Sequence, residues 1–274
     1  MRGTGFSTPS CAAPYRISDC ERVVYRAAAR HRETGMRIAI VSDIHGNRTA
    51  FDAVLADLRQ TSPDLVLHGG DLADSGASPA EIVDRIRDLG WQGVAGNTDE
   101  MLFRPESLTE FASQSPALQP LFAAIEEMAA ATREALGEAR IAWLHSLPRM
   151  QMHGPMALVH ASPASLWRAP APEASDTELE TVYAPLGRPI AIYAHIHRAF
   201  IRSVSGMTVA NTGSVSLSYD GDPRAAYLLL DDYKPAIRRV EFDLDRELKA
   251  LAGCGLPHSD WVAKMLESAR PQMP

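Results

Sequence analysis

The chain has 274 residues, of which 46% are hydrophobic and 22% charged, close to the average for globular proteins. This composition excludes collagen-like, low-complexity and mostly disordered chains. No stretch approaches the ~20 apolar residues that a transmembrane helix needs. The formal net charge is −7, so we expect neither nucleic acid nor a membrane surface as a partner. The chain has three cysteines, Cys11, Cys20 and Cys254. They form no disulfide framework and no CxxC motif, which is consistent with a cytoplasmic location.

Residues 1–35 differ in composition from the rest of the chain. They are rich in arginine and begin with a Gly-, Ser-, Thr- and Pro-rich stretch, but they contain no apolar segment typical of secretory signal peptides. We expect a mobile N-terminal extension or a start codon assigned too early, with an organelle transit peptide as the alternative. Met36 directly precedes a strand-like run, so we expect residues 36–274 to form a single domain.

From Met36 the chain alternates between apolar runs and amphipathic segments, which predicts strands and helices in turn. The residues Ser78-Pro79-Ala80-Glu81 have the pattern of a capping box with proline at the first helical position, so a helix is expected to follow them. The other elements expected in this half are strands at 37–42, 64–68 and 91–95, a helix at 47–60, and two helices within 106–146 divided near Ser115-Pro116.

The second half is richer in strands. Two runs separated by Gly154-Pro155 predict a hairpin, 149–153 with 156–160, and Ser175–Leu186 is expected to be helical with a second capping box. Further strands are expected at 190–194, 200–204, 207–210, 225–231 and 237–243. Alternating strands and helices followed by hairpins predict an α/β fold, with one mixed sheet or two stacked sheets and helices outside.

Polar side chains follow several of the predicted strands. They are Asp43 and His45 after the first strand, then Asp71, Asn97, His160, His195 and His197 after later ones. The carboxyl ends of strands form the ligand crevice of open α/β sheets, so we expect these side chains to meet there. Asp43 and His45 are two residues apart and would share one face of an extended strand, as would His195 and His197.

Each of these residues, taken alone, has an ordinary structural explanation. An aspartate caps or turns a chain, and a histidine is often a satisfied, partly buried side chain. Taken together, the ordered set favours a functional site. For His68 two explanations remain: a role beside the site, including proton donation, or simple packing at the end of a strand. For Asp74 and Asp99 two explanations remain: they orient the site, or they lie in solvated turns. The other histidines are expected to be surface or satisfied side chains without a role in the site, and they are His31, His145, His153 and His258.

The ordered set resembles the pattern of the calcineurin-like metallophosphoesterase superfamily, which is DxH, GD, GN, H and GHxH. The matching blocks are VSDIHGN, GGDLADSG, GNTDE, LVHASP, AHIH and NTGSV, between about Met36 and Glu247. More narrowly, the chain resembles the small bacterial and archaeal phosphodiesterase (YfcE-like) branch, in which the histidine after GN is replaced. This resemblance implies two packed mixed β-sheets flanked by helices, a four-layer αββα sandwich.

The resemblance also implies two divalent metal ions, and mixed imidazole and carboxylate ligands suit manganese, iron, zinc or nickel. Asp71 would bridge the ions, and a metal-bridging hydroxide would attack phosphorus. Asp71, Asn97 and His160 are the implied catalytic residues. The implied ligands of one metal are Asp43, His45, Asp71 and His197, and those of the other are Asp71, Asn97, His160 and His195.

Three positions depart from the broader superfamily pattern. Ser75 replaces the arginine of GDxVDRG, Thr98 replaces the proton-donating histidine after GN, and Ala194 replaces a glycine. The first two changes argue against fast monoester hydrolysis and against protein-phosphatase activity. We therefore expect a phosphodiesterase that acts on a small phosphoester, with Trp167 and Arg168 at the rim of its pocket.

The alternatives are a phosphomonoesterase or nucleotide pyrophosphatase, or a non-catalytic metal-binding interaction module, since retromer has a scaffold subunit with a similar fold. Homo-oligomerisation stays open.

Overall fold

Two five-stranded sheets form the centre of the computed structural model, which describes residues 35–274. The segment 1–34, and with it the expected N-terminal extension, lies outside the described residues. The first sheet has the order β10-β9-β1-β2-β3, and its strands are β1 (Arg37–Val41), β2 (Leu65–His68), β3 (Gln92–Gly93), β9 (Ala225–Asp231) and β10 (Lys234–Val240). The second has the order β4-β5-β6-β8-β7, with β4 (Met150–His153), β5 (Met156–Val159), β6 (Ile190–Tyr193), β7 (Phe200–Val204) and β8 (Met207–Asn211).

Both sheets are mixed. In the first, β1, β2 and β3 are parallel and β9 pairs antiparallel with β1, with Ile38 opposite Leu65 and Leu230. In the second, β5, β6 and β8 are parallel, while β4 and β7 are antiparallel edge strands. The fold class inferred from the sequence resemblance, two packed mixed sheets flanked by helices, is confirmed.

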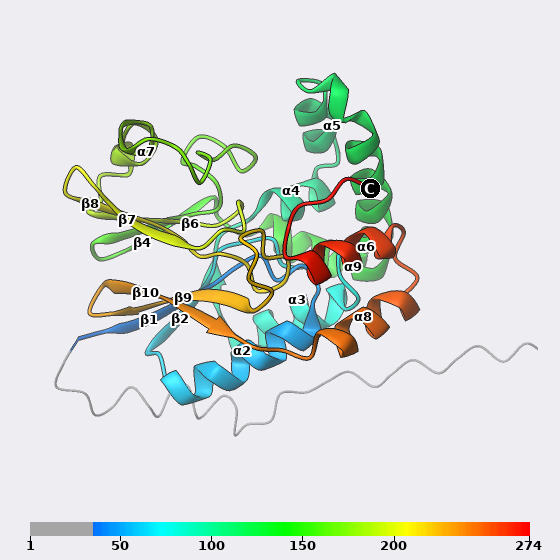
Figure 1. The fold of residues 1–274 in the computed structure, drawn as a ribbon, viewed down its shortest axis with the longest axis horizontal. Coiled ribbons are helices and arrows are strands. Elements are labelled where there is room, and N and C mark those ends of the chain that lie inside the picture. The colour runs from blue at the N-terminus through cyan, green and yellow to red at the C-terminus, as the bar shows by residue number, and fades with distance from the viewer. Residues whose placement is uncertain (1–34) are drawn as a thin grey trace, which may run out of the picture.

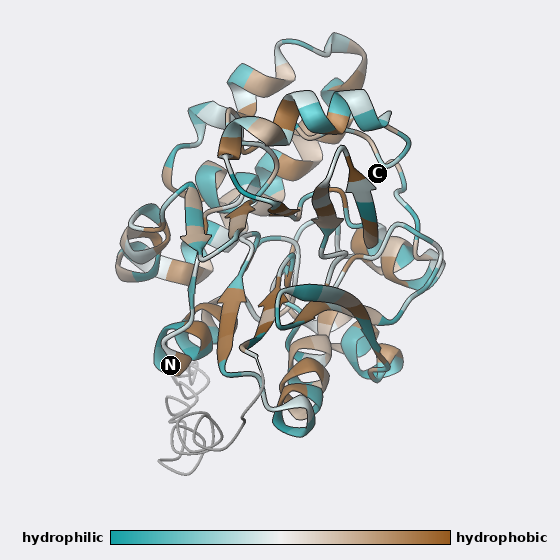
Figure 2. Ribbon diagram, turned by 90° about the vertical axis from the view of Figure 1, so that its left-hand side faces the viewer, coloured by the Kyte–Doolittle hydropathy of each residue, from teal (hydrophilic) through white to brown (hydrophobic). Residues whose placement is uncertain are grey.

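The sheets pack face to face because the two faces of each central strand are both apolar. In β1, Ile38 and Ile40 point towards the second sheet, whereas Ala39 and Val41 point towards the helices. The second sheet supplies Met156, Leu158, Ile190 and Ile192 to the same layer between the sheets. Figure 2 shows these hydrophobic strands gathered in the middle of the molecule.

Helices cover the outer faces. In Figure 1, α2 (Arg48–Thr61) and α3 (Pro79–Leu89) lie on the first sheet and α7 (Asp176–Tyr183) on the second. The short helix η3 (Ala184–Leu186) continues α7, and its Leu186 shares the hydrophobic cluster of α7 and the second sheet. The remaining helices lie at one end of the sheets, and they are α4 (Asn97–Phe103), α5 (Glu106–Ala112), η2 (Pro116–Leu118), α6 (Gln119–His145), α8 (Leu244–Gly253) and α9 (Ser259–Ser268). Among the described residues, no helix combines the length and apolarity that a membrane span requires.

The structure corrects several expected elements. The third strand is only Gln92–Gly93 rather than 91–95, because Ala95 donates its N–H to the carbonyl of Pro148 instead of a neighbouring strand. The last strand begins at Lys234, three residues earlier than expected, since β9 and β10 pair tightly around Asp232 and Tyr233, both at positive φ. Helices α8 and α9 were not predicted.

The two expected capping boxes behave differently. The Ser175 hydroxyl accepts a hydrogen bond from Glu178 N at 3.2 Å, as predicted. Ser78 makes no side-chain capping bond, so the capping box expected there is wrong, although Pro79 does begin the helix. Helix α3 instead follows a turn in which Ser78 N donates to the carbonyl of Gly46.

This difference predicts unequal effects for the same substitution. Ser175→Ala is expected to lower the free energy of unfolding by about 1 kcal/mol, because it removes an N-cap hydrogen bond. Ser78→Ala is expected to change it less, since no cap bond is lost there. Urea denaturation of both variants measures the difference, and equal losses would contradict the assignment of the caps.

Candidate metal centre

The seven candidate site residues lie together where five strands end. Asp43 and His45 follow β1, Asp71 follows β2, and Asn97 begins α4 just after β3. From the second sheet, His160 follows β5, and His195 and His197 follow β6. The site therefore lies at the junction of the two sheets, and it needs both of them.

The first group of donor atoms belongs to Asp43, His45, Asp71 and His197, and all of these atoms lie within 4.8 Å of one another. The Nε2 atoms of His45 and His197 are 3.3 Å apart. His197 Nε2 lies 3.3 Å from Asp43 Oδ1, and His45 Nε2 lies 3.8 Å from Asp71 Oδ2. This is the spacing of side chains that share one central ion.

The second group contains Asp71, His160 and His195. His160 Nε2 is 3.5 Å from Asp71 Oδ2. Asn97 adds an oxygen to this group, because its Oδ1 is 3.0 Å from His160 Nε2 and 2.8 Å from His195 Nδ1. Asp71 thus belongs to both groups, the position that a bridging ligand would occupy.

The backbone at the site is strained. Five of the seven residues have positive φ although none is glycine, and they are Asp43 (53°), His45 (48°), Asp71 (54°), His195 (69°) and His197 (56°). The expectation that Asp43 and His45 share a face of an extended strand is therefore wrong, because β1 ends at Val41 and both residues are left-handed. Strain of this kind persists only where surrounding contacts enforce it. Here Asp43 N donates to the carbonyl of Gly70, and His45 N to that of Asp71.

The tautomers of three histidines follow from their partners. Each Nδ1 lies close to a main-chain carbonyl oxygen, with distances of 3.0 Å from His45 to Asp74, 2.7 Å from His160 to Gly69 and 2.5 Å from His197 to Leu217. A carbonyl oxygen only accepts, so each Nδ1 donates, and the Nε2 of a neutral ring carries a lone pair. This is the arrangement that orients metal-binding histidines.

A cation fits this donor set. In their neutral forms, His45 and His197 face each other with two lone pairs 3.3 Å apart, beside the carboxylate of Asp43. Like dipoles at that distance in a buried site repel each other unless a positive charge lies between them. Imidazole nitrogens and carboxylate oxygens are ligands of divalent transition metals. The residues present therefore fit a metal site.

The pKa values follow from burial and from Asp71. Burial and the adjacent His160 lower the pKa of His195 to about 4. Burial disfavours protonation of His160 too, but the Asp71 carboxylate outweighs it and raises the pKa of His160 to about 9. A cation that binds Asp71 and His160 must replace that proton, so cation binding at this group is expected to release a proton below about pH 9.

Asp71 is held in place by the first turn of α4 and by Gly96, which precedes it. Thr98 N donates to Asp71 Oδ1 at 2.9 Å. A Cβ on Gly96 would lie 2.0 Å from the same oxygen, so only glycine allows this approach. Asp99 accepts three main-chain N–H groups, from Asp71 at 2.8 Å, Leu72 at 3.0 Å and Gly96 at 2.9 Å. Asp99 thereby fastens the Asp71 loop to the Asn97 loop.

Asp74 and Asp99 are buried. The explanation that they lie in solvated turns is therefore wrong. Burial raises the pKa of Asp74 to about 6, and burial together with Asp71 raises that of Asp99 to about 6. Through its carbonyl oxygen, Asp74 also orients the His45 ring.

His68 lies away from the donor atoms. Its ring is completely buried, packs against Trp143 of α6 with the ring centres 6.2 Å apart, and does not line the cavity beside the donors. Burial lowers its pKa to about 3. The packing explanation holds, and the proton-donor explanation does not. His145 stacks on Phe103, His153 contacts Gln151 and His258 contacts Glu127, all outside the site, whereas His31 lies outside the described residues.

A cavity of about 260 Å³ opens beside the donor atoms. Trp167 lines it as expected, with its Nε1 donating to Glu100 at 2.6 Å, but Arg168 does not line it and instead contacts Gln114 and Phe111. The apolar lining from α6 and α9 was not predicted from the sequence. A signal existed, because the apolar residues Trp261, Val262, Met265 and Leu266 recur at helical spacing.

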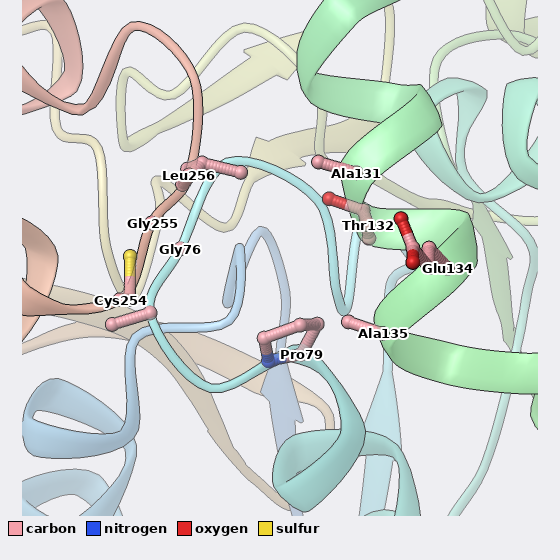
Figure 3. Close-up of a pocket in the computed structure, with 10 residues that line it drawn as sticks. Gly76, Pro79, Ala131, Thr132, Glu134, Ala135, Cys254, Gly255 and Leu256 are labelled. Carbon is pink, nitrogen blue, oxygen red and sulfur yellow. The ribbon is translucent and has the colours of Figure 1, made fainter. Parts of the chain in front are cut away.

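A second cavity, of about 340 Å³, lies between α6 and the turn after α8. Figure 3 shows it lined by Pro79, Thr132, Glu134 and Cys254, among others. None of the seven candidate residues reaches it. The larger cavity is thus not the one beside the donor cluster.

A sequence model of the calcineurin-like phosphoesterase superfamily domain matches residues 36–233. The chain belongs to this superfamily, which confirms the resemblance based on the motifs. A metallophosphoesterase from Sphaerobacter thermophilus has a similar crystal structure, with a TM-score of 0.69, 26% identity, and coverage of 86% of this chain and 99% of that one. The protein is accordingly a phosphoric ester hydrolase.

Two sequence relatives extend the comparison. An uncharacterized protein of Methanocaldococcus jannaschii is 29% identical over 252 residues, which are 84% of this chain and 96% of that protein. A Synechococcus protein named as a probable cyclic nucleotide phosphodiesterase is 43% identical over 68 residues, only 23% of this chain and 25% of that protein. The first relative matches nearly end to end, and the second only locally.

The contact between Gly96 and Asp71 generates a prediction. Gly96→Ala is expected to displace the Asp71 carboxylate, because the added Cβ overlaps Asp71 Oδ1, and therefore to lower the content of bound divalent metal. The φ of Gly96 is −100°, so alanine itself is tolerated by the backbone. Elemental analysis of purified protein measures the loss. The matched control is Gly253→Ala in α8, where the added Cβ meets nothing within 4 Å, and equal metal content in both variants would contradict the prediction.

Proposed function

We propose that the protein is a metal-dependent phosphodiesterase that hydrolyses a small phosphoester in the cytoplasm, using two divalent ions of manganese, iron, zinc or nickel. The observation that supports two ions is the position of Asp71, whose carboxylate belongs to both groups of donor atoms. Asp43, His45 and His197 complete one ligand set, and the other consists of Asp71 with Asn97, His160 and His195.

When bound, such ions supply Lewis acidity and lower the pKa of a water molecule that attacks phosphorus. The residues of the chain do the rest. Asp71, fixed by Thr98 N and Asp99, sets the distance between the two ligand sets. His160, through its bond to the carbonyl of Gly69, presents Nε2 to the site. The Oδ1 atom of Asn97 lies beside the ring nitrogens of His160 and His195. The amide N–H groups of Asn97 are then donors for a phosphate oxygen.

Three observations favour a diester over a monoester. The described residues that line the cavity include no lysine or arginine to neutralise the second charge of a monoester. Ser75 and Thr98, both in the cavity lining, stand where the superfamily pattern has an arginine and a histidine. The local similarity to the Synechococcus protein supports phosphodiester hydrolysis as well.

The test combines metal analysis with activity. The manganese-loaded protein is expected to hydrolyse bis(p-nitrophenyl) phosphate and to act poorly on alkyl monoesters. Asp71→Asn is expected to reduce the content of both ions and to lower kcat, because one neutral amide replaces the shared carboxylate. The matched control is Asp245→Asn, at an exposed position of α8. Unchanged two-ion content in a folded Asp71→Asn protein would contradict the bridging role, and faster turnover of alkyl monoesters would contradict the diester preference.

Thr98 generates a second prediction. A threonine hydroxyl is too weak an acid to protonate a leaving group near neutral pH, and a well-placed general acid contributes about 10²–10⁴-fold. Thr98→His is therefore expected to accelerate esters with poor leaving groups more than nitrophenyl esters, while Thr98 N continues to hold Asp71. The control is Thr98→Asn, which supplies no acid. Equal acceleration of both ester classes, measured as kcat, would show that no proton donor is missing at this position.

A further inference from the structure

The cavity beside the donor atoms has a polar end and an apolar end. The polar end is formed by the candidate ligands together with Ser75 and Thr98. The apolar end is formed by side chains from α6, from α9 and from the segment between β8 and β9. We call these side chains the apolar wall: Leu121, Ile125, Met128, Tyr219, Trp261 and Met265. Side chains of α6 and α9 share one hydrophobic cluster.

The apolar wall is continuous with the donor cluster. Tyr219 stacks on the ring of His197, with ring centres 4.6 Å apart and an interplanar angle of 19°. The hydroxyl at the end of the Tyr219 ring lies 3.6 Å from Met265 Sδ. Contacts therefore run from the donor cluster along Tyr219 to Met265 of α9.

Part of the apolar wall is accessible. Leu121 and Ile125 are half-buried, lie one helical turn apart on α6, and both line the cavity. Trp261 is fixed through its indole N–H, which donates to the carbonyl of Gln272 at 2.9 Å, so the last residues of the chain close this end. Accessible apolar surface beside a polar site is a property of ligand pockets.

Charge limits what this end of the cavity accepts. No lysine or arginine lines the cavity within the described part of the chain, and the carboxylates in its lining are Asp71 and Asp74. A second phosphate or a carboxylate on the substrate would lie against hydrocarbon without a cationic partner, which is unfavourable. The ester group on the wall side is therefore uncharged.

Size sets a second limit. The cavity of about 260 Å³ is smaller than the ~300–1,000 Å³ of sites for drug-sized ligands. A phosphate and one ring-sized group fill such a space.

We propose that the substrate is a phosphodiester with one apolar, uncharged ester group of about the size of an aromatic ring, and that this group packs on the apolar wall. This inference rests on the proposed phosphodiesterase function and adds the chemistry of the substrate. Helix α9 lies beyond residues 36–233, the part that matches the superfamily domain, so two residues of the apolar wall, Trp261 and Met265, come from outside that domain.

Two non-hydrolysable monoanions that differ by one ring test the proposal: methyl(phenyl)phosphinate and dimethylphosphinate, which have no ester bond. Their binding to the manganese-loaded full chain is measured by calorimetry. The phenyl compound is expected to bind at least about tenfold more tightly, because one methylene in an apolar pocket is already worth about 10–200-fold. Equal binding of the two compounds would overturn the proposal.

Two variants locate the ring. Ile125→Lys and, independently, Leu121→Lys are expected to remove most of the preference for the phenyl compound, because each places a charge in the apolar wall. The control is Ala123→Lys, at an exposed position of the same helix that does not line the cavity. An undiminished preference in both folded wall variants would overturn the assignment of the wall.

Hydrolysis of bis(p-nitrophenyl) phosphate by the wild type, measured in parallel, separates the two hypotheses. Hydrolysis without a phenyl preference leaves the proposed function intact and overturns this inference. Absence of hydrolysis overturns the proposed function, and with it the substrate chemistry that rests upon it.

Discussion

The position of the Asp71 carboxylate is the constraint on which the site depends. It is the donor common to both ligand groups, and it lies in a buried environment where an uncompensated charge is unfavourable. Histidine rings face one oxygen, and the N–H of Thr98 binds the other. Gly96 leaves the space for it, and Asp99 joins the two loops that carry it and Asn97. Gly96, Thr98 and Asp99 therefore support the position of one carboxylate.

The same electrostatic requirement explains the strained backbone. Five candidate ligands adopt left-handed conformations just after the strand ends, and through them side chains from two sheets converge, each ligand group within 4.8 Å. The carbonyls of Gly69, Asp74 and Leu217 then fix three rings with their Nε2 atoms towards the site. The folded chain carries an arrangement of lone pairs and carboxylates that a cation would stabilise, so a bound cation is expected to stabilise the fold.

Specificity has a different physical origin from catalysis in this molecule. The donor cluster derives from loops at the strand ends, whereas the apolar lining of the cavity comes mainly from α6 and α9, which pack on each other beyond the sheets. Tyr219 connects the two regions through its stacking on His197 and its contact with Met265. Because hydrophobic contacts tolerate substitution of shape and size, such a wall can differ between relatives that share the same donors.

The sequence by itself determined the alternation of strands and helices, the family and the seven polar residues at strand ends, because these follow from local periodicity and from short motifs in order. It did not determine how they meet. The left-handed turns at Asp43 and His45, the burial of Asp74 and Asp99, and the packing of His68 on Trp143 depend on contacts between distant segments. Identical capping patterns at Ser78 and Ser175 had different outcomes for the same reason. Only the tertiary structure placed Tyr219 and Trp261 beside the donors, since proximity between residues far apart in the sequence is decided by packing and not by sequence spacing.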